Sequence, residues 1–250
     1  MGLNLTRYYS INFDAEKRIK KSIKFIIIHY TGMKKESESI ERLCNPNSRV
    51  SCHYFIKNNG KILNLIPDLY RAWHAGKSSW KNYDSLNDYS IGVEINNPGH
   101  EYVYKKFTSK QINSLIKLLN HLVEKFNLKK QNILGHSDVS PNRKKDPGEK
   151  FPWKKLAKKN LCSWHFIDEK KSKRFRKVKL NRLEEKLFMN NLYNIGYSKK
   201  IYGRVRNKKT DLITAFQRRF RQNLINGMAD KECYLMSKKL VSQKNSLENL

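Results

Sequence analysis

The sequence is poor in acidic residues and has no long apolar run. It contains 22 Asp and Glu against 52 Lys and Arg, which gives a formal net charge of +30. A transmembrane helix needs about 20 consecutive apolar residues, whereas the longest apolar run here, FIIIHY, has only the length of a strand. We therefore expect no transmembrane segment.

The chain also lacks signals for secretion and for disulfide formation. Its N-terminus has no apolar segment of the kind found in secretory signals and no nearby cysteine to carry a lipid. As written, the protein is expected to be cytoplasmic; a leader removed before this numbering would make it periplasmic or part of the cell envelope. The cysteines have no CxxC spacing and are too few for a disulfide framework, so free thiols are expected at Cys44, Cys52, Cys162 and Cys233.

The large positive charge indicates a class of partner without choosing a member of it. A field of this sign attracts nucleic acid, anionic lipid surfaces or acidic cell-wall polymers. Because the basic residues are spread along the chain, part of the excess can equally reflect the Lys and Asn preference of an AT-rich genome. No aromatic RNA-binding signature, zinc-finger spacing or helix-turn-helix pattern is present. Nucleic acid is therefore not expected as a partner.

Residues 1–165 mix strand and helix signals, which predicts an α/β domain built around one sheet. Strands are predicted at KFIIIHYTG, on both sides of the Asn59-Gly60 turn, at SIGVEI and at QNILGH. The clearest helix follows Thr108, which forms a capping box with Gln111. Its predicted apolar stripe consists of Ile112, Leu115, Ile116, Leu119, Val123 and Phe126.

The remaining chain predicts a basic linker, residues 166–180, followed by a small domain of three helices, residues 181–250. The first helix contains Leu183, Leu187 and Phe188 and is expected to end near Gly196. The second contains Leu212, Ile213, Phe216 and Phe220 and is expected to end near Gly227. The third is predicted at DKECYLMSKKL.

Four polar residues stand at the ends of predicted strands or in the loops after them: His29, Glu94, His136 and Asp146. Strand ends of an α/β sheet can converge on one mouth. Two imidazoles and one carboxylate form the ligand set of a catalytic zinc that keeps one position open for water. Glu94 could then take a proton from that water. Lys144 could face the oxyanion that forms when a carbonyl is attacked.

Each of these residues also has a structural interpretation. His29 alone fits a buried core histidine, Glu94 a surface ion pair, and His136 a turn cap. Asp146 before Pro147-Gly148 fits turn chemistry, and Lys144 lies in a run of basic residues that water can solvate. The metal hypothesis therefore depends on all of them occurring together and in order.

Five segments in that order resemble the zinc-dependent N-acetylmuramoyl-L-alanine amidase family, which includes phage amidases and animal peptidoglycan recognition proteins. They are IIIHYTG, VSCHYFI, AWHAG, SIGVEINN and GHSDVSPNRKKDPG, and they span about residues 23–160. The resemblance implies a mixed central sheet flanked by helices and one zinc ion per chain. It places the zinc ligands at His29, His136 and Asp146, the general base at Glu94 and the transition-state lysine at Lys144. Asp146 is closer to the bacterial branch, because the animal branch often has Cys there.

Other residues near these motifs have two interpretations each. His74 resembles a family position near the cleft, where it would contact substrate or make a structural hydrogen bond. Arg71 would hold a muropeptide carboxylate or be solvated, and Asn96 and Asn97 would donate to a peptide or turn the chain. Asp138 is expected to stabilise the loop or to contact a ligand histidine. These residues are the predicted substrate-binding candidates, Asp138 excepted.

The C-terminal part resembles the small helical peptidoglycan-binding domain that accompanies some amidases. The resemblance lies in LFMNNLYNIGY followed by LITAFQRRFRQNLINGMADKE. A generic three-helix packing module is the alternative. The run RRFRQ is more basic than the usual pattern, so it would either bind an acidic glycan-peptide or face solvent.

The leading hypothesis is a zinc hydrolase that cuts the amide between N-acetylmuramic acid and L-alanine in peptidoglycan or its muropeptide fragments, in cell-wall turnover or recycling. The alternative is a peptidoglycan-binding protein without turnover. Since a pure binder has no need of all five residues at once, their joint presence favours the enzyme. The sequence does not indicate the oligomeric state.

Overall fold

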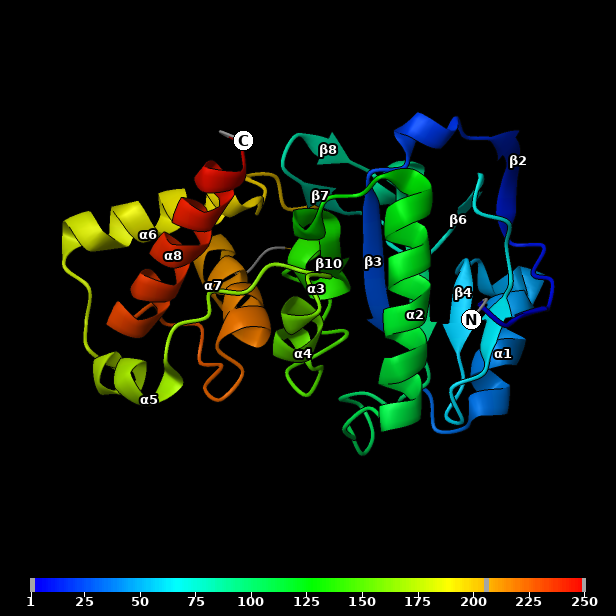
Figure 1. The fold of residues 1–250 in the computed structure, drawn as a ribbon, viewed down its shortest axis with the longest axis horizontal. Coiled ribbons are helices and arrows are strands. Elements are labelled where there is room, and N and C mark those ends of the chain that lie inside the picture. Colours follow the sequence, from blue (N-terminus) through cyan, green and yellow to red (C-terminus); the bar gives the residue numbers. More distant parts are fainter. Residues whose placement is uncertain (1–2, 205–206, 249–250) are drawn as a thin grey trace.

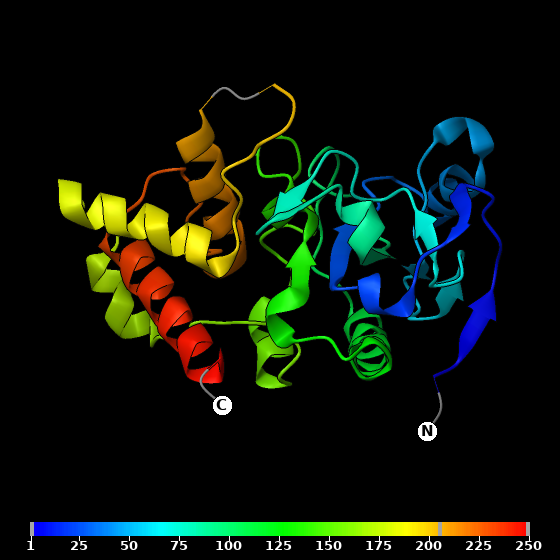
Figure 2. The ribbon, with the colours of Figure 1, turned by 90° about the horizontal axis from the view of Figure 1, so that it is seen from above.

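The structure is a computed structural model that describes residues 3–204 and 207–248. A sheet-containing part and a group of C-terminal helices lie side by side (Figures 1 and 2). The strands are β1 (Leu5–Arg7), β2 (Phe13–Lys17), β3 (Phe25–Tyr30), β4 (Tyr54–Ile56), β5 (Ile62–Asn64), β6 (Tyr70–Ala72), β7 (Ser79–Trp80), β8 (Tyr83–Asp84), β9 (Ser90–Ile95) and β10 (Ile133–Gly135). The helices are α1 (Glu36–Cys44), α2 (Ser109–Phe126), α3 (His136–Val139), α4 (Trp153–Lys158), α5 (Glu169–Ser172), α6 (Arg182–Ile195), α7 (Lys208–Phe220) and α8 (Lys231–Glu248).

The central sheet has six strands in the order β1-β5-β4-β9-β3-β10. Only the β4–β5 hairpin is antiparallel, while the other neighbours run parallel. The Asn59-Gly60 turn joins these two strands. It requires a φ of +87° at residue 60, which glycine adopts without strain. The predicted mixed sheet and its five predicted strands, β3, β4, β5, β9 and β10, are confirmed. The sequence analysis did not predict the short strands β1, β2 and β6 or helix α1.

Helix α2 runs alongside β3 in Figure 1 and is seen end-on in Figure 2. The predicted capping box is present: Thr108 Oγ1 accepts from Gln111 N at 3.1 Å, and Gln111 Oε1 accepts from Thr108 N at 2.9 Å. The buried face is rotated slightly from the predicted stripe. Leu118 and Leu122 are buried, whereas Ile116 and Val123 are only partly buried at the edge of the core.

The C-terminal helices share one hydrophobic core with the sheet. A single cluster of buried side chains includes Ile26 of β3, Phe151 beside α4, Phe188 of α6 and Phe216 of α7. The three predicted helices are confirmed. Helix α7 ends at Phe220 rather than near Gly227, however. Gly227 instead belongs to a loop whose backbone N–H donates to Gln217 Oε1 at 2.9 Å.

Helix α6 contains Leu183, Leu187 and Phe188 and ends before Gly196, as predicted. Leu183 and Leu187 are exposed, and Phe188 and Leu192 form its buried face.

One expectation about this half was wrong. The run RRFRQ was expected to bind an acidic ligand or to face solvent. Arg218, Arg219 and Arg221 are instead buried and pair with acidic side chains inside the protein. The physical reason is that the end of α7 packs against residues 133–151, so Arg218 and Arg219 face Glu149 and Asp138 instead of solvent.

The segment predicted as a basic linker is packed as well. Asp168 caps α5 by accepting from the backbone N–H groups of Lys170 and Lys171. Ser172 is buried and donates to Glu232 Oε1 at 3.1 Å, and Arg176 pairs with the same carboxylate. Residues 166–180, which include α5, therefore pack against α8.

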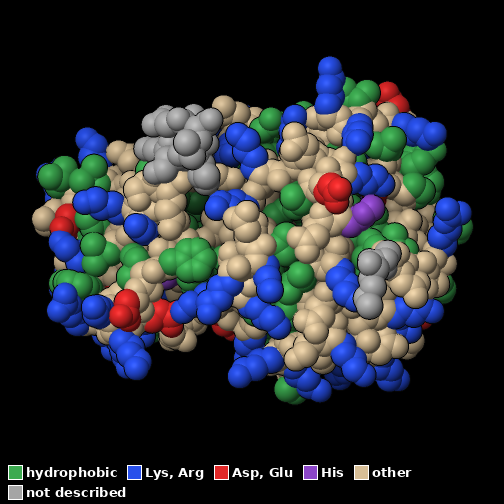
Figure 3. Space-filling model, in the orientation of Figure 1, with side chains coloured by type: hydrophobic (Ala, Val, Ile, Leu, Met, Phe, Trp, Pro, Cys, Tyr) green, Lys and Arg blue, Asp and Glu red, His purple; other side chains and the backbone are tan. Residues whose placement is uncertain are grey.

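On the face seen in Figure 3, Lys and Arg side chains do not gather into one patch but are spread over that face. The four cysteines are free, as expected. Within residues 3–204 and 207–248, no helix combines the length and apolar composition needed to cross a membrane.

The capping box of α2 gives a direct test of the fold. Replacing Thr108 by Ala removes the acceptor for Gln111 N and is expected to lower the free energy of unfolding by about 1 kcal/mol. Urea denaturation followed by circular dichroism measures this loss. Lys110→Ala, in the same turn but with an exposed side chain, is the matched control. An equal loss in both variants would contradict the capping role.

Candidate metal centre and active site

The site begins with the register of three neighbouring parallel strands. His29 of β3 and Glu94 of β9 are direct partners in the parallel pairing of these strands, so both side chains point to the same face of the sheet. On the other side of β3, Gly135 of β10 pairs with Ile28. His136, one residue further, therefore comes level with His29. The strand order β9-β3-β10 thus sets Glu94, His29 and His136 in a row.

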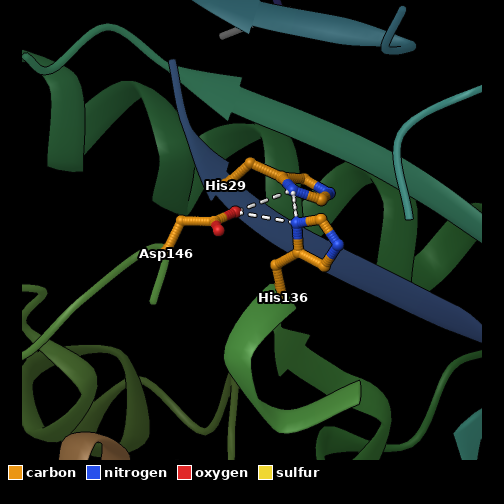
Figure 4. A group of neighbouring side chains, drawn as sticks. All are labelled: His29, His136 and Asp146. Carbon is orange, nitrogen blue, oxygen red and sulfur yellow. Dashed lines mark hydrogen bonds and ion pairs between the residues drawn. The ribbon is translucent and has the colours of Figure 1, made fainter. Parts of the chain in front are cut away.

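Asp146 completes the group from the loop that follows α3. Its Oδ2 lies 3.0 Å from His29 Nδ1 and 3.0 Å from His136 Nδ1, and the two Nδ1 atoms lie 2.9 Å apart. Figure 4 shows the three side chains pointing at one another from three different segments. All three residues are buried. They are the cluster that the sequence predicts as metal ligands.

The loop that carries Asp146 is closed on itself next to the site. Ser137 N donates to the carbonyl oxygen of Asp146 at 2.9 Å, which brings the two ends of the loop together. Gly148 has a φ of +83°, and a Cβ there would lie 2.3 Å from Tyr104 Oη. The glycine is therefore required both by the backbone conformation and by the close approach of Tyr104.

The three ligand atoms fit a divalent metal ion. In a tetrahedral zinc site with Zn–N distances of about 2.0–2.1 Å, neighbouring ligand atoms lie about 3.3 Å apart. The observed separations of 2.9–3.0 Å differ from this by a few tenths of an ångström, which small side-chain rotations supply. Two imidazoles and one carboxylate leave a fourth position open, as catalytic zinc sites do.

Hydrogen bonds on the far side of each imidazole assign the tautomer needed for metal binding. His136 Nε2 lies 3.0 Å from the carbonyl oxygen of Ala75, which can only accept, so the proton belongs on Nε2 and Nδ1 carries a free lone pair. His29 Nε2 lies 3.1 Å from His74 Nδ1, and His74 Nε2 lies 3.3 Å from Ser90 Oγ. Ser90 Oγ donates its proton to the carbonyl oxygen of Leu86, so it accepts from His74 Nε2, and His74 Nδ1 in turn accepts from His29 Nε2. The proton of His29 is therefore on Nε2, and its Nδ1 is free.

The electrostatics of the cluster suit metal ligands. Burial, with the neighbouring His136, lowers the pKa of His29 to about 4, which keeps the imidazole neutral. For Asp146, burial acts to raise the pKa, but the contacts with His136 and His29 outweigh it and hold the pKa well below its usual range. A neutral histidine and an ionised carboxylate are the protonation states in which these groups bind metals.

His74 takes the structural role that the sequence left open. Besides its bond to His29, its ring packs directly over Gly92 of β9, where a Cβ would lie 2.4 Å from the imidazole. Burial, with the neighbouring His29 and His53, lowers the pKa of His74 well below its usual range. His74 also lines the cleft. It therefore orients the imidazole of His29, in the way that outer hydrogen-bond partners of metal-binding histidines usually do.

Glu94 differs from an ordinary surface carboxylate. Burial, reinforced by the negative charge of Asp146, raises the pKa of Glu94 to about 8. Among the residues that the structure describes, none donates a hydrogen bond to its buried Oε2 atom. A carboxyl oxygen that is buried next to the group of His29, His136 and Asp146 and has no hydrogen-bond partner is free to exchange protons with a bound reactant.

These groups open into a cleft with a volume of about 500 Å³. Lys144 lines it, as predicted, together with Lys145, Arg42 and Arg143. Arg143 also donates to the carbonyl oxygens of Ala75 and Lys77, which fixes the wall next to His136. The cleft therefore has a cationic rim around a centre that holds two carboxylates.

Three predicted substrate-binding residues lie elsewhere. Arg71 pairs with Asp14 and Asp88 and lines a separate cavity. Asn96 and Asn97 are buried, and their amides bond within the protein, to Asn58 Oδ1 and to the carbonyl oxygen of Lys105. The structure thus gives all three a structural role, because their polar groups already have partners.

Two sets of contacts near the site were not predicted from the sequence: those of His100, and those of Asp138 beyond its predicted role in the loop. His100 and Tyr30 line the cleft, and a hydrogen bond of 2.8 Å joins His100 Nδ1 to Tyr30 Oη. His100 Nε2 also lies 3.0 Å from Glu149 Oε2. Asp138 is buried and bonds to the C-terminal helices as well as to its own loop. Both contacts join segments far apart in the sequence, so no local pattern reveals them.

Residues 19–149, more than half of the chain, match the family described as N-acetylmuramoyl-L-alanine amidase. The chain is also 32% identical over 233 residues to N-acetylmuramoyl-L-alanine amidase AmiD of Escherichia coli. That match covers 88% of this chain and 83% of AmiD. It therefore extends through both the sheet and the C-terminal helices.

Solved structures agree with this comparison. AmiD of E. coli, solved with its substrate anhydro-N-acetylmuramic acid-L-Ala-D-γ-Glu-L-Lys, superposes with a TM-score of 0.76 at 31% identity, over 89% of this chain and 90% of AmiD. AMPDH3 of Pseudomonas aeruginosa superposes with a TM-score of 0.77 at 28% identity, over 90% of this chain and 93% of its own. The family match, the matched length and the shared fold together show that this chain belongs to the N-acetylmuramoyl-L-alanine amidase family.

Proposed function

We propose that this protein hydrolyses the amide bond between the lactyl group of N-acetylmuramic acid and L-alanine, with one zinc ion held by His29, His136 and Asp146. The observation that carries the proposal is the convergence of two Nδ1 atoms and one carboxylate oxygen within 3.0 Å of one another. Nitrogen and oxygen ligands of this kind suit zinc. The unpaired Glu94 on the adjacent strand supplies the proton-transfer group that a peptidoglycan binder without turnover would not need.

Zinc in such a site brings the pKa of a bound water down to about 7 and polarises a substrate carbonyl. Glu94 faces the same cleft and has a free Oε2. A divalent cation at the neighbouring cluster would favour the ionised form of Glu94. In that form it takes a proton from the attacking water and passes that proton to the nitrogen of the leaving L-alanine. The C–N bond breaks as the new C–O bond is kept, so the products are a free lactyl carboxylate and a free peptide amine.

Lys144 stabilises the charge that develops on the carbonyl oxygen. Its side chain is half-buried in the cleft wall two residues before Asp146, and its positive charge acts on Glu94 and His29. A cation held in a partly dry site is worth more there than in water. The loop that supplies the third metal ligand therefore also supplies the oxyanion contact.

The substrate class is peptidoglycan or its muropeptide fragments. AmiD of E. coli, which shares the fold along nearly the whole chain, has been solved with an anhydro-muropeptide substrate. The cationic rim formed by Arg42, Arg143 and Lys145 complements the carboxylates of such a peptide.

Replacing a ligand tests the metal assignment. His29→Ala and Asp146→Ala are each expected to lose bound zinc and activity together, because two remaining ligands hold the ion poorly. Elemental analysis gives the zinc content, and release of peptide from a soluble muropeptide gives the rate. His121→Ala, an exposed histidine on α2, is the control and should retain both. Zinc at full stoichiometry in both ligand variants would refute the assignment.

Replacing Glu94 separates proton transfer from metal binding. Glu94→Gln keeps the shape but cannot accept the proton, so kcat is expected to fall by about 10²–10⁴-fold while zinc content stays unchanged. Glu101→Gln, an exposed residue lining the same cleft, should change kcat little. If Glu94→Gln turned over muropeptide at the parent rate, the general-base role would have to be dropped.

The two neighbouring lysines test the oxyanion contact. Lys144→Met is expected to lower kcat by about 10²-fold or more with little change in KM, because the charge acts mainly on the transition state. Lys145→Met removes an exposed cation from the same rim and should affect mainly KM. A steady-state comparison of the two variants in which KM alone changes for both would contradict the role of Lys144.

A further inference from the structure

Three arginines at the end of α7 are buried, although arginine is normally an exposed residue. The exposed fractions are 8% for Arg218, 3% for Arg219 and 2% for Arg221. A buried guanidinium is costly unless acidic or carbonyl groups pair with it. The partners of these three side chains therefore show what the end of α7 is attached to.

Arg219 reaches the start of the metal-binding loop. Its guanidinium pairs with Asp138 Oδ2, donates to the carbonyl oxygen of Ile133 at 2.9 Å and lies over the ring of Trp153 at 4.2 Å. Asp138, only 1% exposed, also accepts from the backbone N–H of Gly135 at 2.8 Å. Gly135 immediately precedes the ligand His136, so Arg219 and Asp138 together hold the backbone on both sides of it.

A second side chain from the C-terminal helices acts on the same carboxylate. The hydroxyl of Tyr197, directly after α6, donates to Asp138 Oδ1 at 2.9 Å. Both oxygens of Asp138 are thereby bonded: one to Arg219 and Gly135, the other to Tyr197. Since Tyr197 is itself buried, this network is shielded from water, where hydrogen bonds and ion pairs are strongest.

The other end of the loop is attached to α7 as well. Arg218 faces Glu149 at 3.9 Å, three residues after the ligand Asp146. Gln222, just past the helix, donates to the carbonyl oxygen of Phe151 at 2.8 Å. The end of α7 therefore contacts the chain before His136 and after Asp146, and brackets the segment that supplies two of the three metal ligands.

We propose that Arg219, acting through Asp138, is a positioning residue for the metal centre, so that the C-terminal helices determine the affinity for the metal and not only attachment to a polymer. This inference rests on the proposed function in taking His29, His136 and Asp146 as the metal ligands. Groups that orient metal ligands from outside typically change metal affinity by 10–100-fold when they are removed. The shared core argues the same way, because the helices and the loop are packed as one unit.

The test compares two buried arginines of one helix end. Arg219→Met removes the contact with Asp138 and Ile133. Arg221→Met is the matched control, because Arg221 pairs with Asp230 and Glu232 within the C-terminal part. Among the described residues, its side chain makes no hydrogen bond or ion pair with the loop from 135 to 149. Zn²⁺ affinity is measured by competition with a chromophoric chelator, and the geometry of the site by the visible absorption of the Co²⁺-substituted protein.

Arg219→Met is expected to bind Zn²⁺ about 10–100-fold more weakly and to show a changed Co²⁺ spectrum. Arg221→Met should lower the Tm but keep the parent affinity and spectrum. Arg219→Lys, which can reach Asp138 but not Ile133 at the same time, should recover part of the affinity. Equal Zn²⁺ affinity in the parent and Arg219→Met, or an equal loss in Arg219→Met and Arg221→Met, would overturn the proposal.

Tyr197→Phe decides the question if Arg219→Met does not fold. It removes one hydroxyl from a residue whose ring stays packed against Trp80, and it should weaken Zn²⁺ binding by about fivefold, the effect of one hydrogen bond. An unchanged affinity would overturn the proposal. These affinity measurements are independent of the proposed reaction. If the parent protein bound Zn²⁺ but did not cleave muropeptide, the amidase function would be refuted, while the positioning role could still be measured.

Discussion

The register of three parallel strands is the constraint on which this site depends. Pairing of β9 with β3 sets Glu94 beside His29, and pairing of β10 with β3 brings His136 level with them from the other side. A shift of one residue in either pair would turn the side chains to the opposite face. The long apolar strand FIIIHY holds this register because it is buried on both sides, with only its last residue reaching partial exposure.

Around this row, buried hydrogen bonds decide which atoms are available for chemistry. The carbonyl oxygens of Ala75 and Leu86 can only accept, and so they direct the protons of His136, His74 and Ser90 away from the metal position. Glu94 is the contrasting case, because its free oxygen has no such partner among the described residues. The site thus combines ligands that are fully fixed with one carboxylate that can still accept or release a proton.

The strongly basic composition has two different physical origins in the folded protein. Most lysines are exposed and spread over the surface, as the face in Figure 3 shows. The arginines at the end of α7 are instead buried and paired, and they connect the C-terminal helices to the loop that carries His136 and Asp146. These contacts attach the helical part to the loop at both of its ends.

The sequence alone determined the main strands, helix α2 with its cap, the three C-terminal helices and the convergence of His29, Glu94, His136, Lys144 and Asp146, because local periodicity, turn residues and motif order carry that information. Only the tertiary structure decided which other polar residues serve the site. Arg71, Asn96 and Asn97 pair with residues outside the cleft, whereas Arg219 pairs with Asp138 next to the site. Most of these pairings join segments tens of residues apart, so no local sequence pattern predicts them. A buried polar side chain forms its hydrogen bonds with the partner that the fold places beside it, and the sequence does not show which partner that is.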